Sequence, residues 1–284
     1  MTTELGWWKI GTVFGHAFLA PWLSYLYGRV AKFDIAVLGD YHLQPLRDRP
    51  FLIVSNQNIP ARSELWPLAY LYYFRQYHHS ADSFIFRRVL YDRVGRGIKT
   101  VGICGAPWVS PRPWRNWLQR NIGQPLARGQ MEVQPEYIVL ERFPGARQRR
   151  FLAAIAEAVS NCDPILIFPG AFQGAPDAVG GAATDRRLDP ASSTIESGAA
   201  HIAKRHGLPF LPACIVGSES WKPGTRVTVA FGPPFATDGL SKSEITGRIA
   251  MHVEALHAVH RDKNAAEREA LTVRSGNDEH VAQI

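Results

Sequence analysis

Short apolar runs alternate with amphipathic runs along most of the chain. Runs rich in Val, Ile, Leu and Phe and bounded by turn residues predict buried strands, at 33–39, 51–56, 136–143, 164–170, 209–218 and 226–235. Helical spacing of apolar residues predicts helices, at 63–77, 146–161, 194–207 and 242–261. Strands alternating with helices indicate an α/β fold, with a mainly parallel central sheet flanked by helices.

The stretch between 82 and 130 has a less regular pattern. "DSFIFRRVLYDRVG" at 82–95 and "IKTVGICG" at 98–105 together predict a strand, a helix and a second strand. The Pro- and Trp-rich stretch at 106–130 predicts a long irregular excursion. Excursions of this kind are uncommon inside compact domains and are often functional.

The chain divides into three parts on this pattern. Residues 1–30 predict an apolar helical segment, 31–262 an α/β domain, and 263–284 a frayed C-terminal tail. The first segment is interrupted by Lys9, His16 and Pro21, and is weakly hydrophobic for a spanning helix. Its tryptophans and tyrosines suit a membrane interface or packing on the protein's own core. The expected location is therefore cytoplasmic, with peripheral attachment to the inner face of the membrane left open.

Net charge narrows the classes of partner. The formal charge is +7 at pH 7, which favours anionic partners such as phospholipid headgroups, thioester carriers bearing phosphate, or nucleic acid. No basic low-complexity run or nucleic-acid-binding module is visible in the sequence. The three cysteines, Cys104, Cys162 and Cys214, follow no metal-ligand spacing and are expected to be small buried hydrophobes. We therefore expect no metal.

Several motifs occur in a recognisable order. They read "SNQNIPARSELW" after the second strand, then "YIVLERFP", "ILIFPGAFQG", "ESGAAHIAKRHGLPFLPACIVGS" and "VTVAFGPPF". Over residues 33 to 260 this order resembles the glycerolipid (1-acylglycerol-3-phosphate) acyltransferase superfamily. Pro209 and Pro212 stand where that family has prolines before a Gly-Ser pair.

The resemblance implies a fold of that family and acyl transfer from a thioester. In the family, a loop histidine paired with an aspartate deprotonates an acceptor hydroxyl, which attacks acyl-CoA or an acyl carrier protein. Imidazole suits this work because its pKa lies near neutral pH. The resemblance implies no cofactor, because the acyl-CoA or acyl carrier protein is a co-substrate.

The first motif departs from the family at its reactive positions. Gln57 stands at the histidine, and Arg62 at the aspartate; with two residues inserted, Glu64 becomes the acidic counterpart. A glutamine amide can hydrogen-bond but cannot accept a proton at neutral pH. The sequence therefore resembles a divergent member of the family that lacks the motif histidine.

The acceptor side also departs from the family. Arg142 matches the family's phosphate-binding arginine, whereas Gly170 replaces a glutamate and Phe172 and Gln173 replace small polar residues. This predicts a rebuilt acceptor pocket and a non-glycerolipid acceptor. The expected substrate-binding residues are Arg62, Arg142, Gly170, Phe172, Gln173 and Pro212.

Three interpretations remain open. In the first, an acyltransferase moves an acyl group to an amine, hydroxylamine or alcohol; Glu64 is the acid/base, and Gln57 and Asn56 polarise the carbonyl. Asn56 and Gln57 could instead satisfy only strand-end backbone groups. Other candidate bases are His78, His79 and His201.

The second interpretation replaces the donor by another anionic carrier, such as a charged tRNA. Basic and aromatic residues that could bind it, or equally face a membrane or solvent, are Arg112, Arg115, Arg120, Arg128, Trp108, Trp114, Trp117, Arg147, Arg149 and Arg150. In the third, the protein is a catalytically inactive homologue that binds lipid or acyl chains, or acts as a partner subunit.

Overall fold

The central feature of the fold is one sheet. The structure, a computed structural model, describes residues 32–56, 74–104, 117, 136–141, 146–168, 193–218 and 224–260. Within these residues, seven strands pair in the order β1-β7-β6-β2-β5-β3-β4. Their bounds are β1 Asp34–Leu38, β2 Leu52–Ser55, β3 Lys99–Cys104, β4 Tyr137–Glu141, β5 Ile165–Ile167, β6 Phe210–Val216 and β7 Arg226–Phe231.

The sheet is mainly parallel, as the sequence predicted. β2 runs parallel to β5 and β6, β3 to β4 and β5, and β1 to β7; the β6–β7 pair is antiparallel. β2, β5 and β6 are buried along their whole length. This double-sided burial explains why their sequences are apolar apart from Ser55 at the end of β2, with no polar face.

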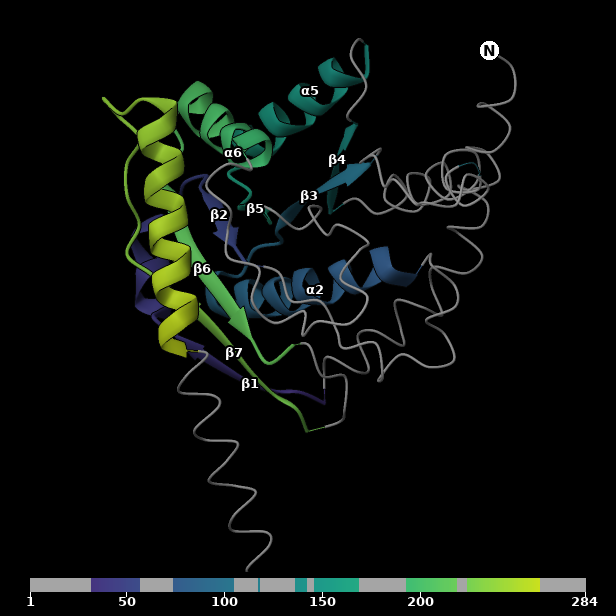
Figure 1. The fold of residues 1–284 in the computed structure, drawn as a ribbon, viewed down its shortest axis with the longest axis vertical. Coiled ribbons are helices and arrows are strands. Elements are labelled where there is room, and N and C mark those ends of the chain that lie inside the picture. The colour runs from purple at the N-terminus through teal and green to yellow at the C-terminus, as the bar shows by residue number, and fades with distance from the viewer. Residues whose placement is uncertain are drawn as a thin grey trace, which may run out of the picture.

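Helices cover both faces of the sheet (Figure 1). They are α2 (Phe74–Val94), α5 (Ala146–Ser160), α6 (Ser193–His206), the 3-10 helix η1 (Asp40–Leu46) and a helix over 242–260. Apolar residues of α2 and η1 share one core cluster with Ile53 of β2. Those of α5, α6 and the 242–260 helix share another with Leu52 and Val54. Two hydrophobic layers, one on each face, thus sandwich the sheet.

Most of the predicted elements are confirmed within the described residues. The strands at 33–39, 51–56, 98–105, 136–143, 164–170, 209–218 and 226–235 correspond to β1 to β7, and the helices at 146–161, 194–207 and 242–261 are also present. Gly207 ends α6 with a φ of 62°, the left-handed conformation that glycine adopts at a helix C-terminus.

The strand predicted at the start of 82–95 is wrong, because this stretch belongs to α2. Residues 82–87 are all buried, so this part of α2 has no exposed face from which a helical period could be read. The 3-10 helix η1 was also not predicted. It contains Pro45, and its buried contacts come from Leu43 and Leu46.

Several predictions lie outside the described residues. These are the N-terminal segment 1–30, most of the helix at 63–77, the excursion at 106–130 apart from Trp117, and the tail at 263–284. The domain division therefore stays a prediction. Among the described helices, none has the length and apolar character needed to cross a membrane.

Candidate functional site

The carboxyl ends of the parallel strands define one edge of the sheet. β2, β3, β4 and β5 all run in the same direction, so residues that follow them leave the sheet at this carboxyl edge. In open α/β sheets, ligands bind in the crevice outside the carboxyl ends of the strands. Three candidates follow such strand ends in sequence: Gln57 comes after Asn56, Arg142 after Glu141, and Gly170 two residues after Phe168.

Asn56 joins β2 to β6 at this edge. Its Nδ2 donates a hydrogen bond to the carbonyl oxygen of Ile215 at 2.8 Å, and the Ile215 N–H donates to Asn56 Oδ1 at 2.8 Å. In the ladder just before it, Ser55 pairs with Ala213. A primary amide presents the same donor and acceptor as a peptide group. The Asn56 side chain therefore extends the β2–β6 ladder after the backbone of β2 has ended.

A hydrogen bond from the neighbouring residue also holds the Asn56 amide in place. The buried Ser55 hydroxyl donates to Asn56 Oδ1 at 3.4 Å. The contact is the strand-end role that the sequence left open for Asn56, and it fixes where the following loop begins. A role for Asn56 in polarising a carbonyl stays a prediction.

Pro212 lies inside β6 and is buried there. It is opposite Val54 in the β2–β6 register, and its carbonyl accepts a hydrogen bond from the Gly232 N–H at 2.8 Å. A Cβ built on Gly232 would lie 3.3 Å from Pro212 Cγ and 3.0 Å from Leu256 Cδ1. The Pro212 ring and Leu256 of the 242–260 helix thus both lie close to Gly232, and the expected substrate contact of Pro212 stays a prediction.

The other predicted site residues lie outside the described residues. They are Gln57, Arg62, Glu64, Arg142, Gly170, Phe172 and Gln173. The predicted site is therefore represented by Asn56 and Pro212 alone, two residues apart in the β2–β6 ladder. The catalytic and substrate-binding assignments of the rest stay predictions.

The histidines proposed as alternative bases are placed only in part. His78 and His79 belong to α2, but their side chains are outside the described residues, while His201 is exposed on α6. Burial, followed by the charges of Arg205 and His201, lowers the pKa of His206. α6 ends at His206, shortly before the amino end of β6, so His206 lies toward the edge opposite Asn56.

The candidate basic–aromatic surfaces are also only partly described. Trp117 is 60% exposed, and Arg149 and Arg150 are exposed on α5. Arg147 also belongs to α5, but its side chain is outside the described residues, as are the remaining arginines and tryptophans of that set. In the part of the chain that the structure describes, no cluster of three or more His, Cys, Asp and Glu side chains could hold a metal ion.

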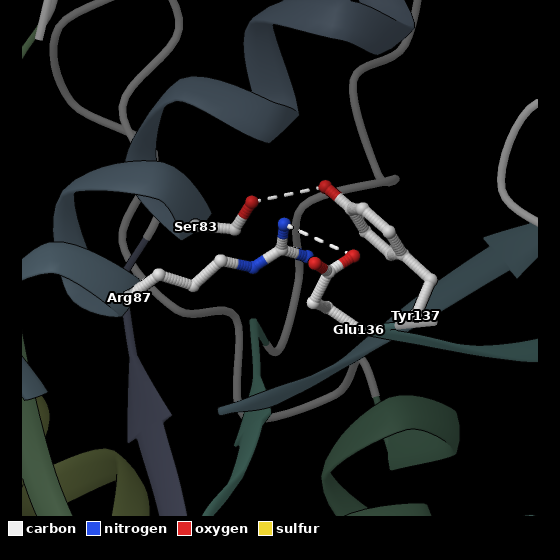
Figure 2. A network of polar contacts seen from close by, with 4 residues as sticks. All are labelled: Ser83, Arg87, Glu136 and Tyr137. Carbon is white, nitrogen blue, oxygen red and sulfur yellow. Dashed lines mark hydrogen bonds and ion pairs between the residues drawn. The ribbon is translucent and has the colours of Figure 1, made fainter. Parts of the chain in front are cut away.

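One polar group was missed entirely in the sequence. Arg87 of α2 is buried beneath the edge strand β4, beside Ser83, Glu136 and Tyr137 (Figure 2). Its Cζ lies 4.7 Å from the centre of the Tyr137 ring and 5.1 Å from that of Phe84. The available signal was a charge inside the apolar run "FIFRRV", which did not distinguish Arg87 from Arg88.

Comparison with known proteins gives one likeness to report. No family model and no curated protein matches the chain. The chain is similar to the crystal structure of the 1-acyl-sn-glycerophosphate (LPA) acyltransferase PlsC from Thermotoga maritima, at 16% identity over 88% of this chain and 80% of that one. The TM-score is 0.38. A value this low assigns neither an activity nor a substrate.

Proposed function

We propose that this protein is an acyltransferase, which moves an acyl group from a thioester carrier to a nucleophilic acceptor at the carboxyl edge of its sheet. The observation that supports the proposal most is the Asn56–Ile215 contact. It anchors the end of β2 immediately before "QNIPARSELW", the segment that resembles the family's reactive loop. In this proposal Asn56 is a positioning residue, because both ends of its amide are engaged with β6.

The reaction needs a nucleophile, a proton acceptor and a leaving group. The acceptor's nitrogen or oxygen attacks the thioester carbonyl carbon, the C–S bond breaks, and the sulfur leaves as a thiolate. Glu64 takes the acceptor's proton and returns a proton to the thiolate, while the Gln57 amide donates to the carbonyl oxygen as charge develops there. The products are the acylated acceptor and the free thiol of the carrier, so the reaction balances.

The proposed acceptor is an amine, a hydroxylamine or an alcohol, but not a glycerolipid. Neutral amines and hydroxylamines are already nucleophilic, so proximity and orientation supply much of the rate and the missing histidine matters less. Arg62, Arg142, Gly170, Phe172, Gln173 and Pro212 are proposed to line the acceptor and donor pockets.

The proposed partners are an acyl-CoA or acyl carrier protein and an anionic membrane surface. A net charge of +7 would attract each of them. This attraction fits a cytoplasmic protein held at the inner face of the membrane, with charged tRNA as the alternative carrier.

Mass spectrometry of reaction mixtures tests this function. Purified protein is incubated with pooled acyl-CoAs, acyl carrier proteins and aminoacyl-tRNAs, together with mixed amine, hydroxylamine and alcohol acceptors. We expect an acylated product from the wild type, its loss with Glu64→Gln, and its retention with Glu254→Gln. The control removes the same charge from an exposed position on the 242–260 helix.

Two outcomes count against this function. Product formed undiminished by Glu64→Gln removes Glu64 from the mechanism. Absence of product with every donor, alongside retained binding of a thioester or lipid, identifies an inactive homologue that binds acyl chains. The mass of any product names the donor and the acceptor together, and so separates CoA, carrier-protein and tRNA donors.

A further inference from the structure

Arg87 is a buried cation whose orientation is fixed by aromatic rings. Its side chain is 9% exposed, and its guanidinium lies over the rings of Phe84 and Tyr137. Contacts of this type hold the guanidinium plane by cation–π attraction and leave its edges for hydrogen bonds. In Figure 2 the Arg87 side chain reaches from α2 toward Glu136 and Tyr137, at the start of β4.

The hydrogen-bonding capacity of this guanidinium is mostly unused. Nη1 faces Glu136 Oε2 at 3.8 Å, which is an ion pair too long for a hydrogen bond. Nε and Nη2 are both buried, and neither has a hydrogen-bond partner among the residues that the structure describes. These two nitrogens form one edge of the planar group, and this edge binds two oxygens of a carboxylate or phosphate side by side. The unused donors therefore form a complete oxyanion fork.

Other polar groups are arranged around Tyr137, whose ring holds the guanidinium. Tyr137 OH and Ser83 Oγ lie 2.9 Å apart and share a hydrogen bond. Thr100, directly opposite Tyr137 in the β3–β4 register, has a buried hydroxyl that forms no hydrogen bond within the described part of the chain. Burying a charge and several donors without partners is unfavourable, so a ligand that accepts hydrogen bonds would relieve a real cost here.

Glu136 is the partly exposed member of this group. The Glu136 side chain is 40% exposed, and β4 is the last strand of the described sheet. A carboxylate held by a 3.8 Å contact to a single nitrogen is a weak occupant, because exposed ion pairs contribute little. Glu136 contacts Nη1 and not the Nε–Nη2 edge, so its movement into solvent would remove a competing negative charge from the same guanidinium while that edge binds another anion.

We propose that Arg87 is the centre of an oxyanion-binding site at the amino edge of β3 and β4. The ligand presents two oxygens of a phosphate or carboxylate group to Nε and Nη2, and Glu136 is displaced as it binds. The site lies at the opposite end of the parallel strands from Asn56, so it is separate from the proposed reaction centre and does not depend on the proposed function.

Calorimetric titration with inorganic phosphate, sulfate and acetate tests the site, with chloride used to keep the ionic strength constant. In the wild type, Glu136 competes with the added anion. Glu136→Gln removes that competing charge, so we expect phosphate to bind about tenfold more tightly, which corresponds to ~1.4 kcal/mol. The ratio of phosphate to acetate affinity distinguishes a phosphate-bearing ligand from a carboxylate.

Three further variants test whether phosphate binds to the Nε–Nη2 edge of Arg87. Arg87→Met should abolish saturable phosphate binding. Arg87→Lys keeps the charge but loses the paired donors, and should weaken binding about tenfold. Arg88→Gln removes a charge from the next position of α2, where the side chain is 44% exposed and pairs with Asp92, and should leave binding unchanged.

The proposal is overturned by either of two results. One is an identical phosphate isotherm for the wild type and Arg87→Met. The other is no saturable phosphate, sulfate or acetate binding by Glu136→Gln, a change at a partly exposed side chain that leaves the core untouched. Because the readout is anion binding, loss of acyl transfer alone leaves this proposal standing.

Discussion

Asn56 follows the carboxyl end of β2, whereas Arg87 of α2 lies beside the amino end of β4 in the same sheet, and the two side chains differ in how far their hydrogen bonds are satisfied. The Asn56 amide makes two bonds of 2.8 Å to one residue of β6. Arg87 makes a 3.8 Å ion pair, and its Nε and Nη2 have no hydrogen-bond partner in the described ranges. A neutral group matched to backbone stabilises the sheet, whereas a buried charge with unused donors has capacity left for a ligand.

The largest expected effect on stability follows from replacing Asn56, whose amide is fully engaged with β6. Asn56→Asp places a carboxylate oxygen against the Ile215 carbonyl, so one hydrogen bond is replaced by repulsion between two acceptors. We expect the free energy of unfolding to fall by about 3 kcal/mol. Urea unfolding at pH 7 measures this change. A fall below ~0.5 kcal/mol would show that the amide contact contributes little.

The reactivity of the Cys214 thiol gives a second measure of how well the Asn56–Ile215 contact holds β6. Burial raises the pKa of its thiol to about 12, so the reactive thiolate is nearly absent at neutral pH. Cys214 precedes Ile215 in β6, so weakening the Asn56 contact should open its surroundings. We expect alkylation of Cys214 in Asn56→Asp to be about tenfold faster than in wild type. Peptide mapping by mass spectrometry measures the rate, with the half-buried Cys162 as internal control.

Replacing Arg87, whose hydrogen bonds are mostly unmade, should raise the free energy of unfolding instead of lowering it. In buffer without phosphate, Arg87→Met removes a buried charge with two unpartnered nitrogens, and we expect unfolding to cost about 1 kcal/mol more than in wild type. Urea unfolding with and without phosphate measures this. Added phosphate should stabilise the wild type and leave Arg87→Met unchanged. A loss of several kcal/mol without phosphate would contradict the comparison, by making Arg87 structural like Asn56.

The smallest expected effect belongs to an exposed polar pair that serves as a reference for both sites. Glu244 accepts hydrogen bonds from Ser241 at the start of the 242–260 helix, and these bonds lower the pKa of its carboxyl group. The contribution of a carboxylate with a lowered pKa is present above its unfolded-state pKa, and is lost as pH falls through the folded value. Glu244→Gln should therefore lower stability slightly at pH 7 and not at pH 2, as urea unfolding at the two pH values would show.

The sequence predicted the strands because most of them are buried runs between turn residues. β5 and β6, for example, are apolar from end to end and follow helices with clear periodicity. The sequence failed at 82–87 because that part of α2 is buried on every side. Periodicity predicts an element only when one of its faces is exposed.

The polar contacts could not be predicted in the same way. Asn56 and Ile215 are 159 positions apart, and their contact depends on β6 crossing beside β2. Arg87 and Arg88 are neighbours in sequence, yet their side chains are 9% and 44% exposed. Only the rotation of α2 decides which of the two enters the core, and an apolar run without a period does not give that rotation.

Hydrogen–deuterium exchange tests most directly whether the proposed reaction centre near Asn56 and the proposed anion site at Arg87 are separate sites. Exchange is followed with and without a non-hydrolysable acyl thioester analogue, and separately with and without phosphate. We predict that the thioester analogue protects peptides containing 52–56 and 210–218, whereas phosphate protects those containing 83–87 and 136–140. Protection of the same peptides by both ligands, or protection of neither edge, would contradict a reaction centre at Asn56 and an anion site at Arg87.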